Sequence, residues 1–226
     1  MDEPFRKDLT HLTWDEVYAR QAKRAHLVGD WMDALGLKAG DRVLEVGAGP
    51  GYVTLVLAVR VGPGGVVYAV DHSAEALGYL ERLQNERGIA HIRRIVANAA
   101  TLEPGGLDVE SALITMVLHH TEDPPGILDN VARLLPLGAL AVVAEFHPEG
   151  PCQVGPPQAH RVKPEQVQTW CEGAGFVVRS CRRQTPEHYM VLVERRRLPA
   201  PSQRAERLSE GDDTPRRDRA PFRIGQ

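Results

Sequence analysis

Residues 43–54 read VLEVGAGPGYVT, an apolar run that leads into three glycines at alternate positions. A strand that ends in a glycine turn and opens a helix is typical of the ligand crevice at the carboxyl edge of a parallel sheet. Glycine adopts positive φ and lets a ligand touch the main chain. We therefore expect Gly47, Gly49 and Gly51 to make room for a ligand, with Glu45 buried in the approach to them.

Short β-branched runs alternate with helical stretches through the middle of the chain. The runs that predict strands cover residues 42–47, 66–71, 91–97, 111–118 and 139–146. Strands and helices in alternation predict a parallel sheet covered on both faces. Two later runs, 176–184 and 188–196, predict an antiparallel hairpin, because the three residues between them are too few for a crossover.

Composition divides the chain into three parts. Residues 1–35 predict a helical N-terminal extension or lid, because apolar groups recur at helical spacing over residues 14–35. Residues 36–198 contain the alternating strands and helices and predict the ligand-binding domain. Residues 199–226 are rich in proline, serine and charge, and predict a disordered tail.

The charge balance disfavours nucleic acid and membrane surfaces as partners. The 226 residues contain 27 Lys and Arg against 30 Asp and Glu, so the net charge of -3 creates no general attraction to polyanions. The charged start differs from a secretory signal, and no apolar run approaches the roughly 18 residues of a membrane span. We expect a cytoplasmic protein.

The cysteines and histidines give no metal-binding pattern. Cys152, Cys171 and Cys181 have unrelated spacings, which predicts reduced thiols rather than a disulfide or a zinc site. His119 and His120 are adjacent at a strand end, where neighbouring side chains point to opposite sides and do not readily chelate one ion. We expect no metal.

Five segments in order resemble the class I S-adenosylmethionine-dependent methyltransferases, in particular the branch of ubiquinone and menaquinone C-methyltransferases. Over residues 14–195 these segments are VLEVGAGPG, VVYAVDHS, ITMVLHHTEDP, NVARLLPLGALAVVAEF and CEGAGFVV. The resemblance implies an α/β fold, a Rossmann-like seven-stranded mostly parallel sheet with helices on both faces and a C-terminal antiparallel hairpin. It also implies S-adenosyl-L-methionine as the cofactor.

A nicotinamide-dependent dehydrogenase is the competing interpretation of the glycine turn. Its fingerprint is G-x-G-x-x-G, whereas the glycines here run G-x-G-x-G with Pro50 among them. Asp71 lies 20 residues after Gly51, at the end of the second predicted strand, where a carboxylate can accept hydrogen bonds from both ribose hydroxyls. The spacing and the terminal hairpin favour S-adenosylmethionine.

The resemblance assigns the cofactor-binding residues. They are Glu45, Gly47, Ala48, Gly49, Gly51, Asp71, His72, Asn98, Ala99 and Leu118. Glu45 is expected to act on the cofactor's amino group through the loop or water. Asn98 stands where the family usually has an Asp; it either accepts from the adenine amino group or forms a turn. His72 either covers the adenine or is an exposed loop residue.

The acceptor is expected beside the ends of the fourth and fifth strands, next to the irregular connection that follows residue 146. His147 or His160 is the candidate general base there, and the alternative is that both histidines only shape the loop. His119 is expected to line the cofactor pocket and His120 to be structural. Trp14 and Tyr18 either close over the pocket or anchor the first helix.

Absent motifs narrow the substrate class. The fourth motif lacks both the Asn/Asp-Pro-Pro-aromatic sequence that holds a flipped base and the Pro-Cys pair of cytosine C5 chemistry. We expect a methyltransferase for a small-molecule acceptor. The alternatives are a non-catalytic scaffold that binds S-adenosylmethionine, or a methyltransferase directed to protein or RNA. The sequence favours no particular oligomeric state.

Overall fold

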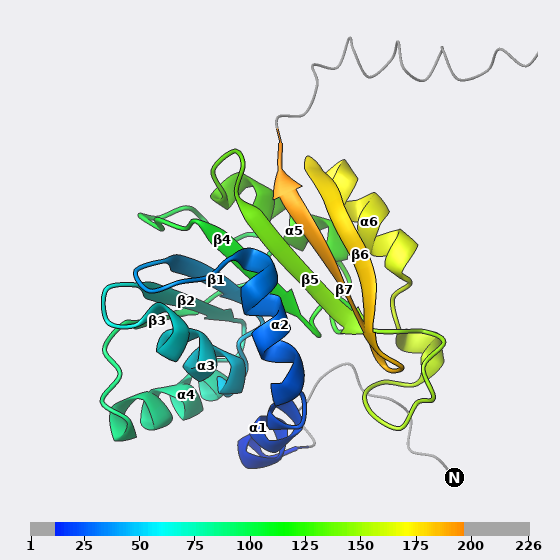
Figure 1. Ribbon diagram of the computed structural model, residues 1–226. Coiled ribbons are helices and arrows are strands. Elements are labelled where there is room, and N and C mark those ends of the chain that lie inside the picture. The colour runs from blue at the N-terminus through cyan, green and yellow to red at the C-terminus, as the bar shows by residue number, and fades with distance from the viewer. Residues whose placement is uncertain (1–11, 197–226) are drawn as a thin grey trace, which may run out of the picture. The chain divides into compact units, whose positions relative to one another are not determined.

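A computed structural model describes residues 12–196 of the chain (Figure 1). The predicted disordered tail at 199–226 and the first residues of the predicted N-terminal extension lie outside the described residues.

Seven strands of the described chain form one sheet in the order β3-β2-β1-β4-β5-β7-β6 (Figure 1). The first five pair in parallel, and β7 lies antiparallel between β5 and β6. The strands are β1 (Arg42–Val46), β2 (Val66–Asp71), β3 (Ile92–Val96), β4 (Ser111–Thr115), β5 (Leu140–Phe146), β6 (Phe176–Thr185) and β7 (His188–Arg195). The predicted parallel sheet and terminal hairpin are confirmed.

Three of the helices begin at capping residues that the sequence carries. A capping box between Thr13 and Glu16 begins α1, Ser73 caps α4, and Asp123 caps α5. The helical segments are α1 (Trp14–Ala22), α2 (Ala25–Leu35), α3 (Tyr52–Val61), α4 (Ala74–Glu86), α5 (Pro124–Leu134), the short 3-10 helix η1 (Gln158–His160) and α6 (Pro164–Gly173).

Two sequence-based boundaries were wrong. The continuous helical pattern over 14–35 is interrupted at Lys23 and Arg24, because Arg24 leaves helical geometry with φ -97° and ψ 10° and starts a second helix. The predicted fourth strand is shorter at its carboxyl end, because Met116 adopts φ 56° and turns the chain out of the sheet.

The sheet separates two apolar layers because successive strand residues point to opposite faces. Val43 packs with Trp31 and Leu57 on the face covered by α2, α3 and α4. Leu44 packs with Leu128 on the face covered by α5 and α6. Figure 1 shows α2 and α3 on the near face of the sheet, with α5 and α6 behind it.

The strand order reverses between β1 and β4, since β1 pairs with β2 on one side and with β4 on the other. Ligands of open parallel sheets bind at such a point, outside the carboxyl ends of the strands. The segments that follow β1, β2, β4 and β5 begin at residues 47, 72, 116 and 147. The fold therefore directs all four predicted site segments to one edge.

Candidate functional site

The glycine turn after β1 is fixed by backbone hydrogen bonds. The amides of Gly47 and Ala48 donate to Val70 O at 2.8 and 3.0 Å, and the amide of Gly51 donates to Ala48 O at 3.1 Å. Gly47, Gly49 and Gly51 have φ values of 73°, 54° and 89°. Because side chains disfavour positive φ, this turn requires glycine even without a ligand.

Protein side chains occupy much of the space beside the glycines, which corrects the expectation that a ligand alone excludes side chains there. A Cβ atom on Gly47 would lie 2.1 Å from Cγ2 of Val117, and one on Gly51 would lie 2.3 Å from Cδ1 of Leu80. A Cβ on Gly49 would lie 3.0 Å from Nε2 of Gln21, at the far end of a flexible side chain. Gly47 and Gly51 are therefore packing positions.

Gln21, at the end of α1, is a site residue that sequence reasoning missed. Its Nε2 donates to Ala48 O at 3.0 Å, and its Oε1 accepts from the amide of Tyr52 at 3.0 Å. It thus caps α3, whose N-cap residue Gly51 has no side chain to do so. A glutamine in an amphipathic helix carries no sequence signal for this contact.

Asp71 joins the second strand to the glycine turn. Its Oδ2 accepts from the amide of Gly49 at 2.8 Å, and its Oδ1 accepts from the amide of Ser73 at 2.9 Å. Each carboxylate oxygen has a further lone pair, so the side chain can accept additional hydrogen bonds. His72 is exposed, with Nδ1 3.5 Å from Asp71 Oδ1, as the alternative of an exposed loop residue expects.

Glu45 lies below the glycine turn and inside the core. Thr54 Oγ1 donates to Glu45 Oε2 at 2.5 Å. Burial raises the pKa of Glu45 to about 7, although the hydrogen bond from Thr54 opposes that change. The carboxyl group is held against α3 by Thr54. Its effect on the cofactor through the loop stays a prediction.

Asn98 forms a turn after β3. Its Oδ1 accepts from the amide of Ala100 at 2.9 Å, which is the geometry of an Asx turn. The neighbouring Ala99 is half-buried, and its carbonyl accepts from Asn130 Nδ2 at 2.8 Å. The turn interpretation accounts for this residue, while its contact with an adenine group stays a prediction.

The segment after β4 connects the glycine turn to β5. Val117 packs beside Gly47, and the amide of Leu118 donates to Glu145 Oε1 at 2.7 Å. Nδ1 of His119 lies 2.7 Å from Glu145 Oε2. The positive φ of Met116, at the head of this segment, is a strained geometry of the kind that clusters at functional sites.

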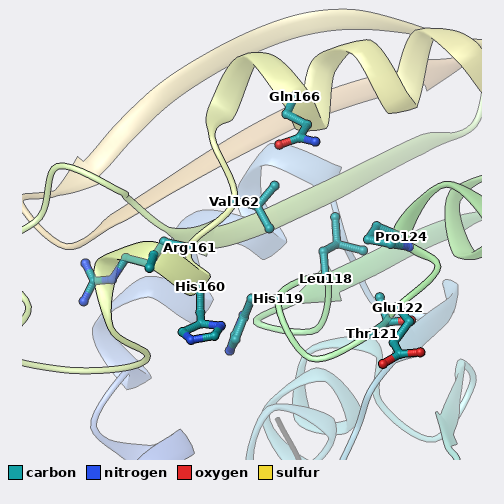
Figure 2. A pocket seen from close by; sticks show the side chains of 10 residues that line it. Leu118, His119, Thr121, Glu122, Pro124, His160, Arg161, Val162 and Gln166 are labelled. Atoms are coloured by element: carbon teal, nitrogen blue, oxygen red, sulfur yellow. The ribbon is translucent and has the colours of Figure 1, made fainter. Parts of the chain in front are cut away.

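A pocket of about 440 Å³ lies between this segment and the start of α6. Residues from 118–124 form one side and residues from 159–166 form the other. Figure 2 shows the side chains of His119 and His160 on the pocket wall, while the guanidinium of Arg161 turns away. Leu118 and His160 are thus the predicted site residues that line this pocket.

His147 is not among the residues that line this pocket. Its amide donates to Glu187 O at 2.7 Å, and its Nδ1 accepts from the amide of Glu149 at 3.2 Å. Its ring packs edge-on against Tyr189, and burial, with help from Arg183, lowers the pKa of His147. The two candidate bases, His147 and His160, therefore do not line the same pocket. His147 mainly anchors the chain after β5.

Arg161 organises the irregular connection that follows β5. Its buried guanidinium donates to Glu187 Oε2 at 2.7 Å and also to the carbonyls of Pro156, His147 and Val154. Burial would raise the pKa of Glu187, but the hydrogen bonds from Arg161 and the Gln153 amide keep it below its ordinary value. The donors of Arg161 are therefore used to hold the connection after β5.

Tyrosines hold α1 against the neighbouring helices. The ring centroid of Tyr18 is 5.4 Å from that of Tyr52 and 5.9 Å from that of Tyr79. The Tyr79 hydroxyl donates to Asp15 Oδ1 at 2.6 Å. Together with Gln21, these contacts place α1 beside the glycine turn, which suits both the lid and the anchor interpretations of the first helix.

Within residues 12–196 no three His, Cys, Asp or Glu side chains are grouped so that they could hold a metal ion. No helix of the described chain is long and apolar enough to cross a membrane.

The family model described as a methyltransferase domain matches residues 18–181. The chain belongs to this family. The fold agrees: a methyltransferase from Aquifex aeolicus superposes with a TM-score of 0.72 at 21% identity, over 80% of this chain and 98% of that one. Geranyl diphosphate C-methyltransferase from Streptomyces coelicolor superposes with a TM-score of 0.64 at 16% identity, over 76% and 77%.

Curated relatives of this methyltransferase-family chain share parts of its sequence. Ubiquinone biosynthesis O-methyltransferase of Burkholderia ambifaria is 34% identical over 58% of this chain and 56% of its own length. The 2-phytyl-1,4-naphtoquinone methyltransferase of Trichormus variabilis is 34% identical over 50% and 49%. Protein-L-isoaspartate O-methyltransferase of Fervidobacterium nodosum is 36% identical over 36% and 41%. The chain thus spans about half the length of these relatives.

The cofactor of this methyltransferase family is S-adenosyl-L-methionine, and the carboxyl edge fits it. Asp71 is a partly exposed acceptor at the position expected to bind a ribose. The glycine turn brings main chain to this edge of the sheet, and Leu118 lines the adjoining pocket. The arrangement offers a site for an adenosine group beside a site for a second molecule.

Proposed function

We propose that the protein transfers a methyl group from S-adenosyl-L-methionine to a small-molecule acceptor. Similarity to two quinone methyltransferases supports an acceptor of this kind. The observation that carries the proposal is the pocket of about 440 Å³, which shares Leu118 and His119 with the segment packed on the glycine turn. A volume of this size suits a small organic molecule.

The proposed cofactor contacts follow the loops of the carboxyl edge. Asp71 accepts from the ribose hydroxyls, with Gly49 and Ser73 holding its carboxylate in place. The residues proposed beside it are Glu45 acting through the loop, Gly47, Ala48 and Gly51 in the turn, His72, Asn98 and Ala99 near the adenine, and Leu118 near the methyl group.

When bound, S-adenosylmethionine supplies a methyl group on a positively charged sulfur. The protein's part is to align the acceptor with that carbon, to exclude water, and to receive a proton where the acceptor must lose one. Of the two histidines that the sequence singles out, His160 lines this pocket and His147 does not, so His147 is no longer proposed to receive that proton. His160 is labelled on the pocket wall in Figure 2.

The test combines binding with product analysis. Calorimetry with S-adenosylmethionine and S-adenosylhomocysteine measures cofactor affinity, with Asp71→Ala as the matched control. Mass spectrometry then follows transfer of a ¹³C-methyl group to catechol, 4-nitrocatechol, a quinol, an alkylamine and an alkylthiol. We expect binding by the wild type, weaker binding by the variant, and transfer to at least one acceptor.

Three results would contradict the proposal in different ways. Binding without transfer to any acceptor supports the alternative of a non-catalytic scaffold. Transfer only to an isoaspartyl peptide added to the panel supports a protein-directed enzyme, the activity named for one of the relatives. Absence of cofactor binding removes the proposed function altogether.

A further inference from the structure

A buried carboxylate–histidine pair forms part of the pocket wall. The side chains of His119 and Glu145 are 2% and 0% exposed, and Nδ1 of His119 is 2.7 Å from Oε2 of Glu145. Glu145 also accepts from the amides of Leu118 at 2.7 Å and Phe146 at 3.3 Å. Both carboxylate oxygens therefore have donors, and the orientation of the pair is fixed.

The partners of Glu145 determine which nitrogen of His119 carries the proton. Burial would raise the pKa of Glu145, but His119 and the amide of Leu118 lower it below its ordinary value. An ionised carboxylate only accepts, so Nδ1 of His119 must donate to it. In the neutral ring, Nε2 then holds the free lone pair.

Within residues 12–196 the His119 ring makes its hydrogen bond through Nδ1, and Nε2 makes none. The ring lines the pocket together with His160 (Figure 2). The ring also lies 5.4 Å, between centroids, from Phe146 in an edge-on arrangement, and 4.1 Å from His120. Neighbours thus hold the ring on several sides, and the ring itself forms part of the cavity wall.

Stability alone does not account for this pair. A buried pair of ionisable side chains gains little over apolar side chains of similar volume, because desolvation offsets the attraction. The same pair provides what proton transfer requires: a neutral imidazole with one nitrogen open and a carboxylate placed to stabilise the imidazolium that forms.

The position of His119 also suits the reaction. It lies two residues after Val117, which packs against Gly47 of the proposed cofactor loop. One short segment therefore contacts the cofactor side with Val117 and the pocket with His119. A base on this segment would sit beside the acceptor atom that faces the methyl group.

We infer that His119, oriented by Glu145, is the general base of the proposed methyl transfer and that the acceptor atom is a hydroxyl oxygen. This inference rests on the proposed function. A hydroxyl is a weak nucleophile until its proton leaves. A neutral amine attacks with its own lone pair, a carboxylate has no proton to lose at neutral pH, and a thiol ionises more readily than an alcohol. An imidazole whose Nδ1 donates to a carboxylate is thus best suited to catalyse O-methylation.

The step balances without another reactant. The hydroxyl oxygen forms a bond to the methyl carbon while the carbon–sulfur bond breaks, and that electron pair stays on sulfur as the neutral thioether. The hydroxyl proton moves to Nε2 of His119, and Glu145 stabilises the positive charge through Nδ1. The proton then passes to solvent through the pocket that His160 also lines.

The test compares two phenols of different acidity. Catechol keeps its proton at neutral pH, whereas 4-nitrocatechol is largely ionised. We expect His119→Ala to lower kcat for catechol by about 100- to 10,000-fold, the usual contribution of general base catalysis. The same variant should lower kcat for 4-nitrocatechol less than about tenfold, and added imidazole should restore part of the catechol activity.

Companion variants separate catalysis from folding. His119→Asn keeps an amide donor for Glu145 and should show the same dependence on phenol acidity. Glu145→Gln, which alters a positioning residue, should lower kcat for catechol without changing its KM. His26→Asn, at an exposed histidine on α2, is the matched control with wild-type activity. All four variants should bind S-adenosylhomocysteine within about twofold of wild type, since a base contributes to the transition state rather than to cofactor binding.

The outcomes are distinct. Equal losses for both phenols, or no rescue by imidazole, would show that His119 is structural and overturn the inference. Transfer by the wild type to the amine or thiol but to neither phenol would overturn it as well and leave the proposed function standing. Failure to bind cofactor or to methylate any acceptor would remove both proposals.

Discussion

The cofactor half and the acceptor half of the carboxyl edge are built from different chemical groups. Around the glycine turn the contacts are mostly main-chain amides and carbonyls, with Asp71 and Gln21 as the side chains that bond to them. Around the pocket the contacts are buried pairs of ionisable side chains, His119 with Glu145 and Arg161 with Glu187. Main-chain sites leave glycine patterns in a sequence, whereas such side-chain pairs leave no pattern that tells which residues are partners.

The largest effect is expected in the acceptor half, from Arg161→Met. It leaves Glu187, which is 8% exposed, without its cation and leaves three carbonyls without their donor. Loss of one partner of a buried ion pair costs about 3–5 kcal/mol of unfolding free energy. Urea unfolding measures the loss.

Arg179→Met is the matched control, because Arg179 pairs with Glu194 at the exposed edge of the same sheet. Exposed pairs contribute little, so the loss should be clearly smaller. Equal losses in the two variants would break the distinction between a buried pair that organises the pocket and an ordinary surface pair.

In the cofactor half the buried Glu45 should make stability depend on pH. Its native pKa is raised to about 7 from an ordinary 4.5, so the native state binds more protons than the unfolded state between these values. Stability should therefore fall as the pH rises through this window, by about 3 kcal/mol in all. Urea unfolding of cofactor-free protein at pH 5 and pH 8 measures it.

Glu45→Gln cannot lose this proton and serves as the control. The difference in unfolding free energy between the two pH values should be smaller in the variant than in the wild type. Parallel pH dependence in both proteins would mean that Glu45 is already ionised in the native state.

Asp71→Ala should weaken the binding of S-adenosylhomocysteine by about 1.5–3 kcal/mol, the range for hydrogen bonds to a charged group. Asp71→Asn keeps one oxygen acceptor and should lose less. Calorimetry gives both affinities. A loss below about 0.5 kcal/mol in the alanine variant would mean that the carboxylate only braces Gly49 and Ser73.

Alanine substitutions at Gly47 and Gly49 compare a glycine that packs against protein with one that lies beside the proposed cofactor. Both positions have positive φ, but a Cβ on Gly47 meets Val117 at 2.1 Å and one on Gly49 meets only Gln21 at 3.0 Å. Gly47→Ala should therefore destabilise the fold by about 1–3 kcal/mol more than Gly49→Ala. Thermal and urea unfolding measure the difference.

Adding Val117→Ala to Gly47→Ala should recover part of that difference, because it removes the blocking methyl groups. Gly49→Val, in contrast, should abolish cofactor binding and leave the fold largely intact. Unchanged cofactor affinity in that variant would remove Gly49 from the cofactor site.

The smallest effect concerns Asn98. If its amide oxygen accepts from the adenine amino group, Asn98→Asp should tighten binding by about 0.5–1 kcal/mol and Asn98→Leu should weaken it. The series should flatten with a cofactor analogue that lacks this amino group. A spread that persists with the analogue would leave Asn98 as the turn residue that its bond to Ala100 describes.

The sequence by itself determined the sheet, its terminal hairpin and the place of the glycine turn. Alternating apolar periods specify strands and helices, and connection lengths separate parallel from antiparallel pairing. The family resemblance placed Asp71 at the end of β2, where the structure has it. These features depend on local spacing along the chain, which a single sequence displays directly.

Only the tertiary structure decided which side chains meet across the edge. Gln21 contacts Ala48 of the glycine turn, 27 residues away, and Glu145 contacts His119, 26 residues away. No sequence motif predicts either contact. The sequence did not predict that His147 lies outside the pocket or that Arg161 pairs with Glu187, because burial and pairing depend on how the strands and loops pack. Backbone geometry follows from local pattern, whereas the pairing of buried charges is a property of the folded whole.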